Sequence, residues 1–587
     1  MRPNFTLSAV FSIAVISAVQ TTFAQTNIFP STGAAGIGTT TPDASSLLEV
    51  KSTTKGILVP RVTKNQRDAI ATPATGLLIY QTNSTPGFYY YSGTAWTAIS
   101  AKPGWSLTGN AGTISGTNFL GTTDAQPLMF KVSNKKSGLI DFDVAKANTA
   151  FGYRSLFSNT TGFSHTAYGY AALYSDSTGY CNTAVGYMAL YMNLRSGRNT
   201  AIGYQALFSN DGDGNVANGF NALYSNTSGV QNTADGTYAL YNNITGCWNA
   251  AGGFNALTSN TSGFYNTAYG TEALASNTTA SSNSAIGFQS LNKNTTGYGN
   301  TASGSQSLYS NTTGVGNTAN GEAALYYNIY GYDNTATGES ALYVNNGIDN
   351  TATGSGALLH NTTGGFNTAT GFWSLYNNIT GTNNTALGYR ADVVSANLSN
   401  ATAIGASASV DASNKVRIGD NNVTSIGGQV GWTSFSDGRY KKNIKTDVPG
   451  LSFINSLKPI TYTVDINRLN SYYDKGRKHD SAYEKMKADM QPSADAAAKI
   501  VYNGFIAQEV EAAAKKLDYE FSGVDKPKTE DGLYGLRYAD FVVPLVKAVQ
   551  ELSAKNDVKD AKISDLETRL AKLEAMMNVQ QSAVSKN

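Results

Sequence analysis

The stretch Ser436 to Ile444 carries the residue types with the clearest chemical potential, because a serine stands five residues before a lysine. A serine hydroxyl is a weak nucleophile until a base removes its proton, and a lysine amine becomes such a base when burial or nearby charge disfavours its protonated form. Ser/Lys pairs are a known variant of serine activation. On spacing alone, the favoured explanation of Ser436, Asp437 and Lys441 is an ordinary turn with a helix cap and a solvated lysine, and only the flanking matches described next favour the dyad.

The residues around this pair extend the pattern. Ser436 to Ile444 resembles the motif S-D-x-R-x-K-x-N-I, which opens the endosialidase-type intramolecular chaperone domain, a self-cleaving peptidase module at the carboxyl end of phage tailspikes and related fibres. Further matches are Gly504 to Val510, Tyr534 to Tyr538 and Pro544 to Leu552. The resemblance covers about residues 434–552 and implies an α+β chaperone domain there.

Two departures from the family pattern stand out. Tyr440 takes the place of a usual aliphatic residue, and residues 467–499 form a variable insertion. Neither departure touches the serine or the lysine.

The resemblance implies that Ser436 and Lys441 form a catalytic dyad. The enzyme activity that follows is at most a single-turnover serine peptidase acting on its own chain. Attack within one chain is easiest through a five-membered ring on the carbonyl of Phe435, so the expected scission lies beside Ser436, in the segment Phe435, Ser436, Asp437. Attack from a neighbouring chain would relax that constraint. No cofactor and no metal are expected.

Most of the chain consists of fifteen consecutive copies of a 17-residue unit close to N-T-A-x-G-x-x-A-L-Y-x-N-T-T-G-x-x, over residues 148–400. Self-similarity at this period is typical of a solenoid. The third position is always Ala, the fifth always Gly, and the ninth Leu until the last copy. The copies begin at Asn148, His165, Asn182, Asn199, Asn215, Asn232, Asn249, Asn266, Asn283, Asn300, Asn317, Asn334, Asn350, Asn367 and Asn384.

A 17-residue coil is too short for two helices, whereas two strands of four or five residues with turns fit it. The sequence therefore predicts a mainly β protein with a β-solenoid (β-roll) shaft on the order of 70 Å long at strand spacing. The invariant Gly and the N-T-T-G segment supply the corners. One Leu and two small residues per coil give a thin core, which favours several chains sharing it in a homotrimer.

Aromatic residues recur at the tenth position of the repeat. They predict either a structural ladder of packed rings or a track that binds cell-surface glycans, because rings suit carbohydrate faces. The sequence does not separate the two. The residues are Phe157, Tyr174, Tyr191, Phe208, Tyr224, Tyr241, Tyr309, Tyr326, Tyr343 and Tyr376.

The first 24 residues read as a secretory signal peptide, with an apolar stretch from Leu7 to Val19 and a small-residue ending. We therefore expect export to an extracellular or cell-surface location. The stretch is too short for a membrane span, and no other segment is long enough. A formal charge of +2 on 587 residues does not suggest nucleic acid. Cys181 and Cys247 lie four coils apart, too far for an intrachain disulfide.

Residues 31–103 predict a small β domain, and residues 104–147 a β connector. Ser52 to Thr63 and Thr85 to Tyr89 resemble the amino-terminal part of exported tail-fibre-like proteins of the Bacteroidetes type. Residues 401–433 predict a second, β-roll connector that resembles the head repeats of trimeric autotransporter adhesins, a fold shared by three chains.

Residues 545–578 predict a coiled coil, because apolar residues alternate by four and three. The alternative is a single amphipathic helix that packs on its own domain. The seam residues are Leu545, Val549, Leu552, Asn556, Lys559, Ile563, Leu566, Leu570, Leu573 and Met577.

The favoured function is an exported adhesin-like or tail-fibre-like protein whose C-terminal domain registers three chains and then removes itself. The alternative is a fibre that binds or degrades glycans, which would need a converging pair of carboxylates. The repeats show no evident pair. Their acids are Asp176, Asp211, Asp213, Asp235, Glu272, Glu322 and Glu339.

Overall fold

The computed structural model describes residues 32–99, 109–114, 116–143, 145–474, 481–528, 530 and 532–584. The predicted signal peptide lies outside these residues. The chain divides into two compact units, residues 1–121 and residues 122–587, and each is described by itself.

The described residues of the first unit form two small sheets and one short helix. The helix α1 (Lys64–Asp68) begins with a capping box between Thr63 and Gln66. The strands are β1 (Ala35–Ile37) and β2 (Leu48–Val50), which pair in parallel, and β3 (Arg61–Val62), β4 (Leu78–Gln81), β5 (Gly87–Tyr91) and β6 (Trp96–Ala98), which form one sheet in that order. Arg67 is buried and donates from Nη1 to Gln81 Oε1 at 2.6 Å, which ties α1 to β4.

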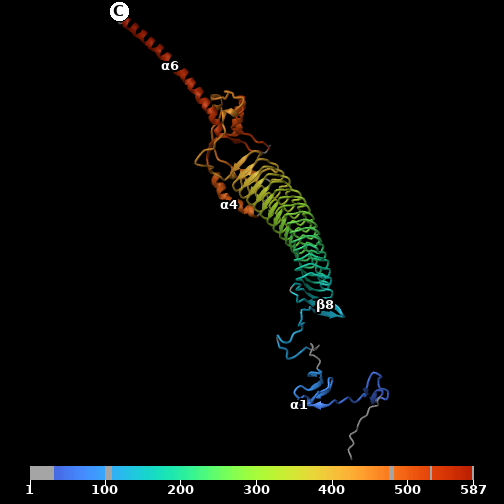
Figure 1. The fold of residues 1–587 in the computed structure, drawn as a ribbon. Coiled ribbons are helices and arrows are strands. Elements are labelled where there is room, and N and C mark those ends of the chain that lie inside the picture. Colours follow the sequence, from blue (N-terminus) through green and yellow to red (C-terminus); the bar gives the residue numbers. More distant parts are fainter. Residues whose placement is uncertain are drawn as a thin grey trace, which may run out of the picture. The chain divides into compact units, whose positions relative to one another are not determined.

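The second unit begins with the antiparallel strands β7 (Leu128–Val132) and β8 (Lys135–Ile140), and β8 pairs with the first strand of the shaft. Each coil then contributes one strand to a parallel sheet, in register, so that Ala167 lies opposite Ala184 (Figure 1). The strands are β9 (Thr149–Phe151), β10 (Thr166–Tyr168), β11 (Thr183–Val185), β12 (Thr200–Ile202), β13 (Val216–Asn218), β14 (Thr233–Asp235), β15 (Ala250–Gly252), β16 (Thr267–Tyr269), β17 (Ser284–Ile286), β18 (Thr301–Ser303), β19 (Thr318–Asn320), β20 (Thr335–Thr337), β21 (Thr351–Thr353), β22 (Thr368–Thr370), β23 (Thr385–Leu387), β25 (Thr402–Ile404) and β27 (Val416–Ile418).

The solenoid is confirmed, but the expected two strands of four or five residues per coil are wrong. Each coil has one three-residue strand, and turns make up most of the rest. A second parallel pair, β24 (Asp392–Val393) with β26 (Ser409–Val410), is present at the end of the shaft. The turns still bond from coil to coil, as Leu257 N does to Ala273 O at 3.0 Å, so the backbone links the stack outside the strands too.

The shaft core is filled by the small and apolar repeat positions. The third-position Ala and ninth-position Leu, such as Ala268 and Leu274, are fully buried. The fifth-position Gly is required, since Gly270 has a φ of 140° and a Cβ there would overlap the carbonyl oxygen of Gly287. Because these coils bury their core within one chain, the expectation that several chains share it does not hold for the described shaft.

Two ladders of buried asparagines complete the interior. At the twelfth position, Asn243 Nδ2 donates to Asn226 Oδ1 of the preceding coil at 2.8 Å and to Gly246 O at 2.9 Å. At the first position, Asn249 N donates to Asn232 Oδ1 at 3.0 Å. The amides thus satisfy buried backbone groups and one another, which is what burial of polar groups requires.

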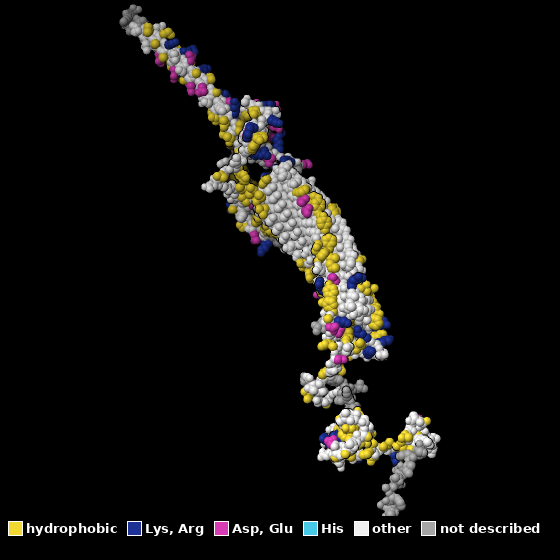
Figure 2. Space-filling view, viewed as in Figure 1, with side chains coloured by type: hydrophobic (Ala, Val, Ile, Leu, Met, Phe, Trp, Pro, Cys, Tyr) yellow, Lys and Arg dark blue, Asp and Glu magenta, His cyan; other side chains and the backbone are white. Residues whose placement is uncertain are grey.

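The aromatic residues at the tenth position stack as a ladder. Phe157 to Tyr241 form a continuous series with ring centroids 5.0–5.3 Å apart, and Tyr309 to Tyr343 form a second. The sixth position forms a ladder that the sequence analysis missed, in which Tyr170 and Tyr187 stack at 5.1 Å. Hydrophobic side chains follow the shaft in rows between uncharged polar surface (Figure 2).

The C-terminal region has a small core of buried Phe453, Val510, Phe521 and Phe541 with their neighbours. Its elements are η1 (Gly438–Tyr440), α2 (Leu451–Ile454), β28 (Ile460–Tyr462), α3 (Ile466–Tyr473), α4 (Ser481–Ala497), β29 (Tyr502–Gly504), α5 (Ala507–Lys516), β30 (Val524–Asp525), β31 (Gly535–Leu536), η2 (Tyr538–Phe541) and α6 (Val542–Val584). β28 pairs antiparallel with β29, and β30 with β31. No helix within the described residues is long and apolar enough to cross a membrane.

Candidate functional site

Ser436 and Lys441 lie side by side in the segment that joins the shaft to the C-terminal region. Lys441 Nζ is 2.8 Å from Ser436 Oγ, within hydrogen-bond distance. In this arrangement the protonated amine donates to the hydroxyl, and to act as a base the amine must first lose a proton. Both side chains are exposed in the single chain.

One turn of 3-10 helix, η1, brings the lysine back onto the serine. Asp437 caps this turn by accepting from Arg439 N at 2.9 Å, and Lys441 N donates to Gly438 O at 3.1 Å. The Arg439 guanidinium also donates to the Asp437 carboxylate, with Nη2 2.6 Å from Oδ2. The hydrogen bond from the Arg439 side chain is the larger cause, and the one from the Arg439 backbone N–H is the smaller, of a lowered pKa of Asp437. Asp437 and Arg439 therefore hold the turn that sets the distance from Ser436 to Lys441. From the sequence, the Asp437 cap is only an alternative to the dyad, whereas in the structure the cap and the Ser436–Lys441 contact occur together.

Large apolar side chains that are close to the pair in the sequence are exposed. Trp432 is 86% exposed, Phe435 76% and Tyr440 70%. The rings of Phe435 and Tyr440 meet edge to face at 5.5 Å, so the residue that departs from the family pattern packs beside the expected scissile bond. Exposed apolar groups of this size commonly mark a surface that another chain covers.

The insertion at 467–499 forms most of α3 and α4. These helices contact the end of the shaft, where Ser407 Oγ lies 3.7 Å from Met486 Sδ and Asn421 Nδ2 donates to Asn470 Oδ1 at 2.9 Å. Nothing in the sequence pattern indicates these contacts.

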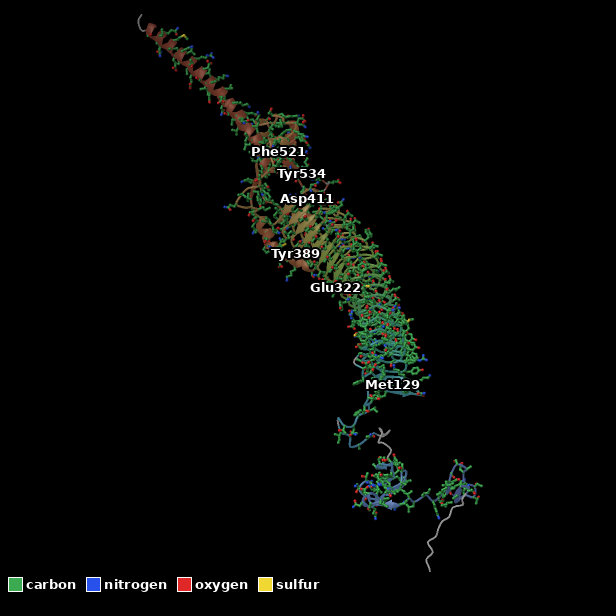
Figure 3. All side chains as sticks on the ribbon, in the orientation of Figure 1. Met129, Glu322, Tyr389, Asp411, Phe521 and Tyr534 are labelled. Carbon is green, nitrogen blue, oxygen red and sulfur yellow. The ribbon has the colours of Figure 1, made fainter. Side chains whose placement is uncertain are left out.

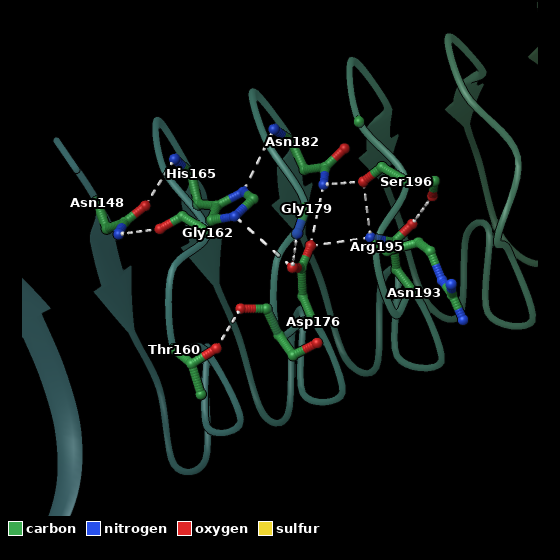
Figure 4. Close-up of polar contacts among 12 residues, drawn as sticks. Asn148, Thr160, Gly162, His165, Asp176, Gly179, Asn182, Asn193, Arg195 and Ser196 are labelled. Atoms are coloured by element: carbon green, nitrogen blue, oxygen red, sulfur yellow. Dashed lines mark hydrogen bonds and ion pairs between the residues drawn. The ribbon is translucent and has the colours of Figure 1, made fainter. Parts of the chain in front are cut away.

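The second coil of the shaft contains a pair of buried titratable groups. In the second coil, His165 and Asp176 occupy the two asparagine ladder positions, and His165 Nε2 lies 3.8 Å from Asp176 Oδ1 (Figure 4). Asp176 accepts from Gly179 N at 2.8 Å and from the amides of Asn182 and Asn193 at 3.0 and 2.8 Å. Burial lowers the pKa of His165 and raises that of Asp176.

The other shaft acids offer little for glycan hydrolysis. Glu322 and Glu339 occupy the same repeat position in neighbouring coils, and both are exposed. Figure 3 shows Glu322 on the shaft. Neither glutamate lines the cavity of about 510 Å³ at the shaft end. The two cysteines, Cys181 and Cys247, are free, in line with the spacing argument.

The helix α6 is continuous over the predicted coiled-coil segment. Its first turns pack on the domain through buried Ala548, while the apolar residues from Leu552 to Met577 are exposed. The helix is thus established, and its pairing with other helices stays a prediction.

Comparison with known proteins finds two similar regions. A family model described as the phage tail like trimerisation region matches residues 36–115, and one described as the chaperone of endosialidase matches residues 436–519. No curated protein matches the chain. With a β-solenoid shaft between these regions, the chain fits a tail-fibre-like protein that carries a trimerisation region and a C-terminal chaperone region.

Proposed function

We propose that this chain is the subunit of an exported trimeric fibre, whose C-terminal region brings three chains into register and then cuts the chain beside Ser436. The 2.8 Å contact between Lys441 Nζ and Ser436 Oγ carries the proposal, because it places a candidate base on a candidate nucleophile. The matches to a trimerisation region and to an endosialidase chaperone support it.

The proposed reaction begins when the neutral amine of Lys441 takes the proton of the Ser436 hydroxyl. The oxygen attacks the carbonyl carbon of Phe435, and the resulting alkoxide sits on a five-membered ring. The bond from this carbon to Ser436 N then breaks as the lysine returns its proton to that nitrogen, which leaves an ester on Ser436. Water hydrolyses the ester, so the products are the Phe435 carboxylate and a free Ser436 amine and hydroxyl.

Assembly of the chains would bury Ser436 and Lys441, which are exposed in the single chain. A lysine loses its proton readily only when burial or a nearby cation disfavours the charge, and Ser436 and Lys441 are exposed here. Neighbouring chains that cover Trp432, Phe435 and Tyr440 would exclude water from the pair. Cleavage would then follow correct assembly, and the fibre would keep its form because unfolded shafts no longer carry the registering region.

The part of the chain before the cut, roughly residues 25–435, would then serve as an adhesive or structural protein outside the cell. The predicted signal peptide and the uncharged polar shaft surface support this location. Glycan binding stays a prediction, and the ring faces of the tenth-position ladder are largely covered by their neighbours. Glycan-array binding by the shaft and by a variant that lacks Tyr224 and Tyr241 tests this prediction, and a loss of binding in the variant would support it.

The decisive experiment compares the wild-type protein with Ser436→Ala and Lys441→Met after incubation and denaturing electrophoresis. The wild type should release a C-terminal fragment of about 150 residues that begins at Ser436, whereas both variants stay intact. Lys442→Met serves as a matched control that keeps cleavage. If the wild type remains whole although folded and trimeric, self-cleavage is wrong and the chaperone role alone stands.

A further inference from the structure

The hairpin of α3 and α4 contacts the last coils of the shaft through side chains on both partners. Arg390 of the shaft is 3% exposed and its guanidinium lies 4.5 Å from the ring centres of both Trp373 and Tyr483. Trp373 belongs to the shaft, whereas Tyr483 belongs to α4 and is 1% exposed. Cation–π contacts are stronger when the cation is desolvated. The shaft supplies the cation and one ring, and Tyr483 of α4 supplies the second ring.

The hairpin has little core of its own. Ile466, Ala494 and Ala497 are its buried cluster, with Val464 and Ala498 packed against them. Burial raises the pKa of Tyr473, and the next cause is the charge of Asp411 at the shaft end. Tyr473 and Tyr483 of the hairpin thus both lie against the last coils of the shaft, which carry Tyr389 and Asp411 (Figure 3).

Contacts from the rest of the C-terminal region reach the same end of the shaft. Lys415 Nζ lies 3.4 Å from Asp525 Oδ2, and Lys528 Nζ donates to Ser413 O at 3.1 Å. A cavity of about 510 Å³ lies beside the hairpin contacts. It is lined by Asn422 and by further residues of both the shaft end and the hairpin. The interface is thus concentrated in a few side chains, with Tyr483 the largest that is buried.

The connecting segment, in contrast, adds nothing to this attachment. Residues 423–436 are exposed and contain no helix or strand. The proposed scission after Phe435 would cut this segment and leave every contact described above in place.

We infer that the α3–α4 hairpin is a non-covalent clasp that keeps the C-terminal fragment bound to the shaft after the chain is cut. This inference rests on the proposed function for the natural cut, yet the clasp itself does not depend on the dyad. The cleaved fibre would keep its C-terminal region, and loss of that region would need a second event that opens the clasp.

The test cuts the connecting segment with an added protease instead of by self-cleavage. In full-length Ser436→Ala protein, a site for a sequence-specific protease is placed between Gly427 and Gly428, and the digest is run on size exclusion under native conditions and on denaturing electrophoresis. We expect two fragments on the denaturing gel that co-elute on the column. Separate elution of the C-terminal fragment from this parent protein at micromolar concentration overturns the clasp, whatever the outcome for self-cleavage.

Variants on α4 locate the attachment. Tyr483→Ala should weaken retention of the fragment by about tenfold or more, because the ring and its cation–π contact are both lost. Tyr483→Phe keeps the ring and should retain the fragment, and Lys485→Ala, an exposed residue of the same helix, is the matched control. Equal retention in Tyr483→Ala and Lys485→Ala, with both folded by circular dichroism, would show that the hairpin is not the clasp.

Discussion

His165 Nε2 and Asp176 Oδ1 lie 3.8 Å apart inside the shaft, at the two positions where most other coils hold asparagines. One coil has therefore exchanged both members of a neutral ladder for a pair that titrates. The neighbouring amides that bond to Asp176 are those that would bond to an asparagine, so at Asp176 the exchange alters charge more than shape.

The pair should make the stability of the second coil depend on pH. In Asp176→Asn, burial leaves the pKa of His165 below its unfolded value of 6.5, so the unfolded state binds more protons and stability falls as pH drops below about 6.5. In His165→Asn, the raised pKa of Asp176 gives the opposite sign, and stability falls as pH rises above about 4. Either slope reaches at most about 1.4 kcal/mol per pH unit.

Hydrogen exchange of the coil-two amides as a function of pH, corrected for intrinsic exchange, measures these slopes, because repeat proteins open locally. The double variant with two asparagines is the control and should show neither slope. Parallel slopes in the two single variants would contradict the assignment.

Gly270→Ala should lower the free energy of unfolding of the shaft by several kcal/mol, because the substitution adds both backbone strain and an atomic overlap. The residue has φ 140°, and its Cβ would overlap Gly287 O. Gly299→Asn is a matched control, since Asn383 holds the same repeat position with φ 59°. Urea unfolding followed by circular dichroism compares them, and a similar midpoint for both variants would show that the close approach of coils is not what fixes the glycine.

Asp437→Ala should slow self-cleavage about tenfold to a hundredfold, because the cap that sets the Ser436 to Lys441 distance is lost. Asp437→Asn keeps an oxygen that accepts from Arg439 N and should retain most of the rate. The time course of fragment release on gels checks both. A full rate in Asp437→Ala would mean that the turn is held by other contacts once the chains assemble.

Leu570→Asp should weaken trimerisation, since a charge in the predicted seam of α6 would be buried between helices. Ala571→Asp adds the same charge off the seam and should leave assembly unchanged. Sedimentation velocity over a dilution series distinguishes them. If the two variants assemble alike, α6 is a single exposed helix and chain registration depends on other regions.

The sequence predicted the shaft from its period, because a core Ala, a corner Gly and an inward Leu recur at fixed positions and each acts within one coil or on the next. The sequence predicted longer strands than the structure has, because asparagine is usually a surface residue, whereas the asparagines of the repeat are buried. There Asn243 and its counterparts bond to turn carbonyls, so turns replace the expected longer strands. The sixth-position ladder was visible in the sequence as Tyr170, Tyr187 and Tyr204 and was overlooked.

At the candidate site, the motif placed Ser436 and Lys441 one turn apart, and a single turn is a local structure that neighbouring residues determine. The seating of Tyr483 against Arg390 is different in kind. It joins residues 93 positions apart in the chain, and nothing in either local pattern encodes the other. Short-range repetition and capping thus follow from the order of residues, whereas the docking of an insertion onto a shaft depends on complementary surfaces that exist only after both have folded.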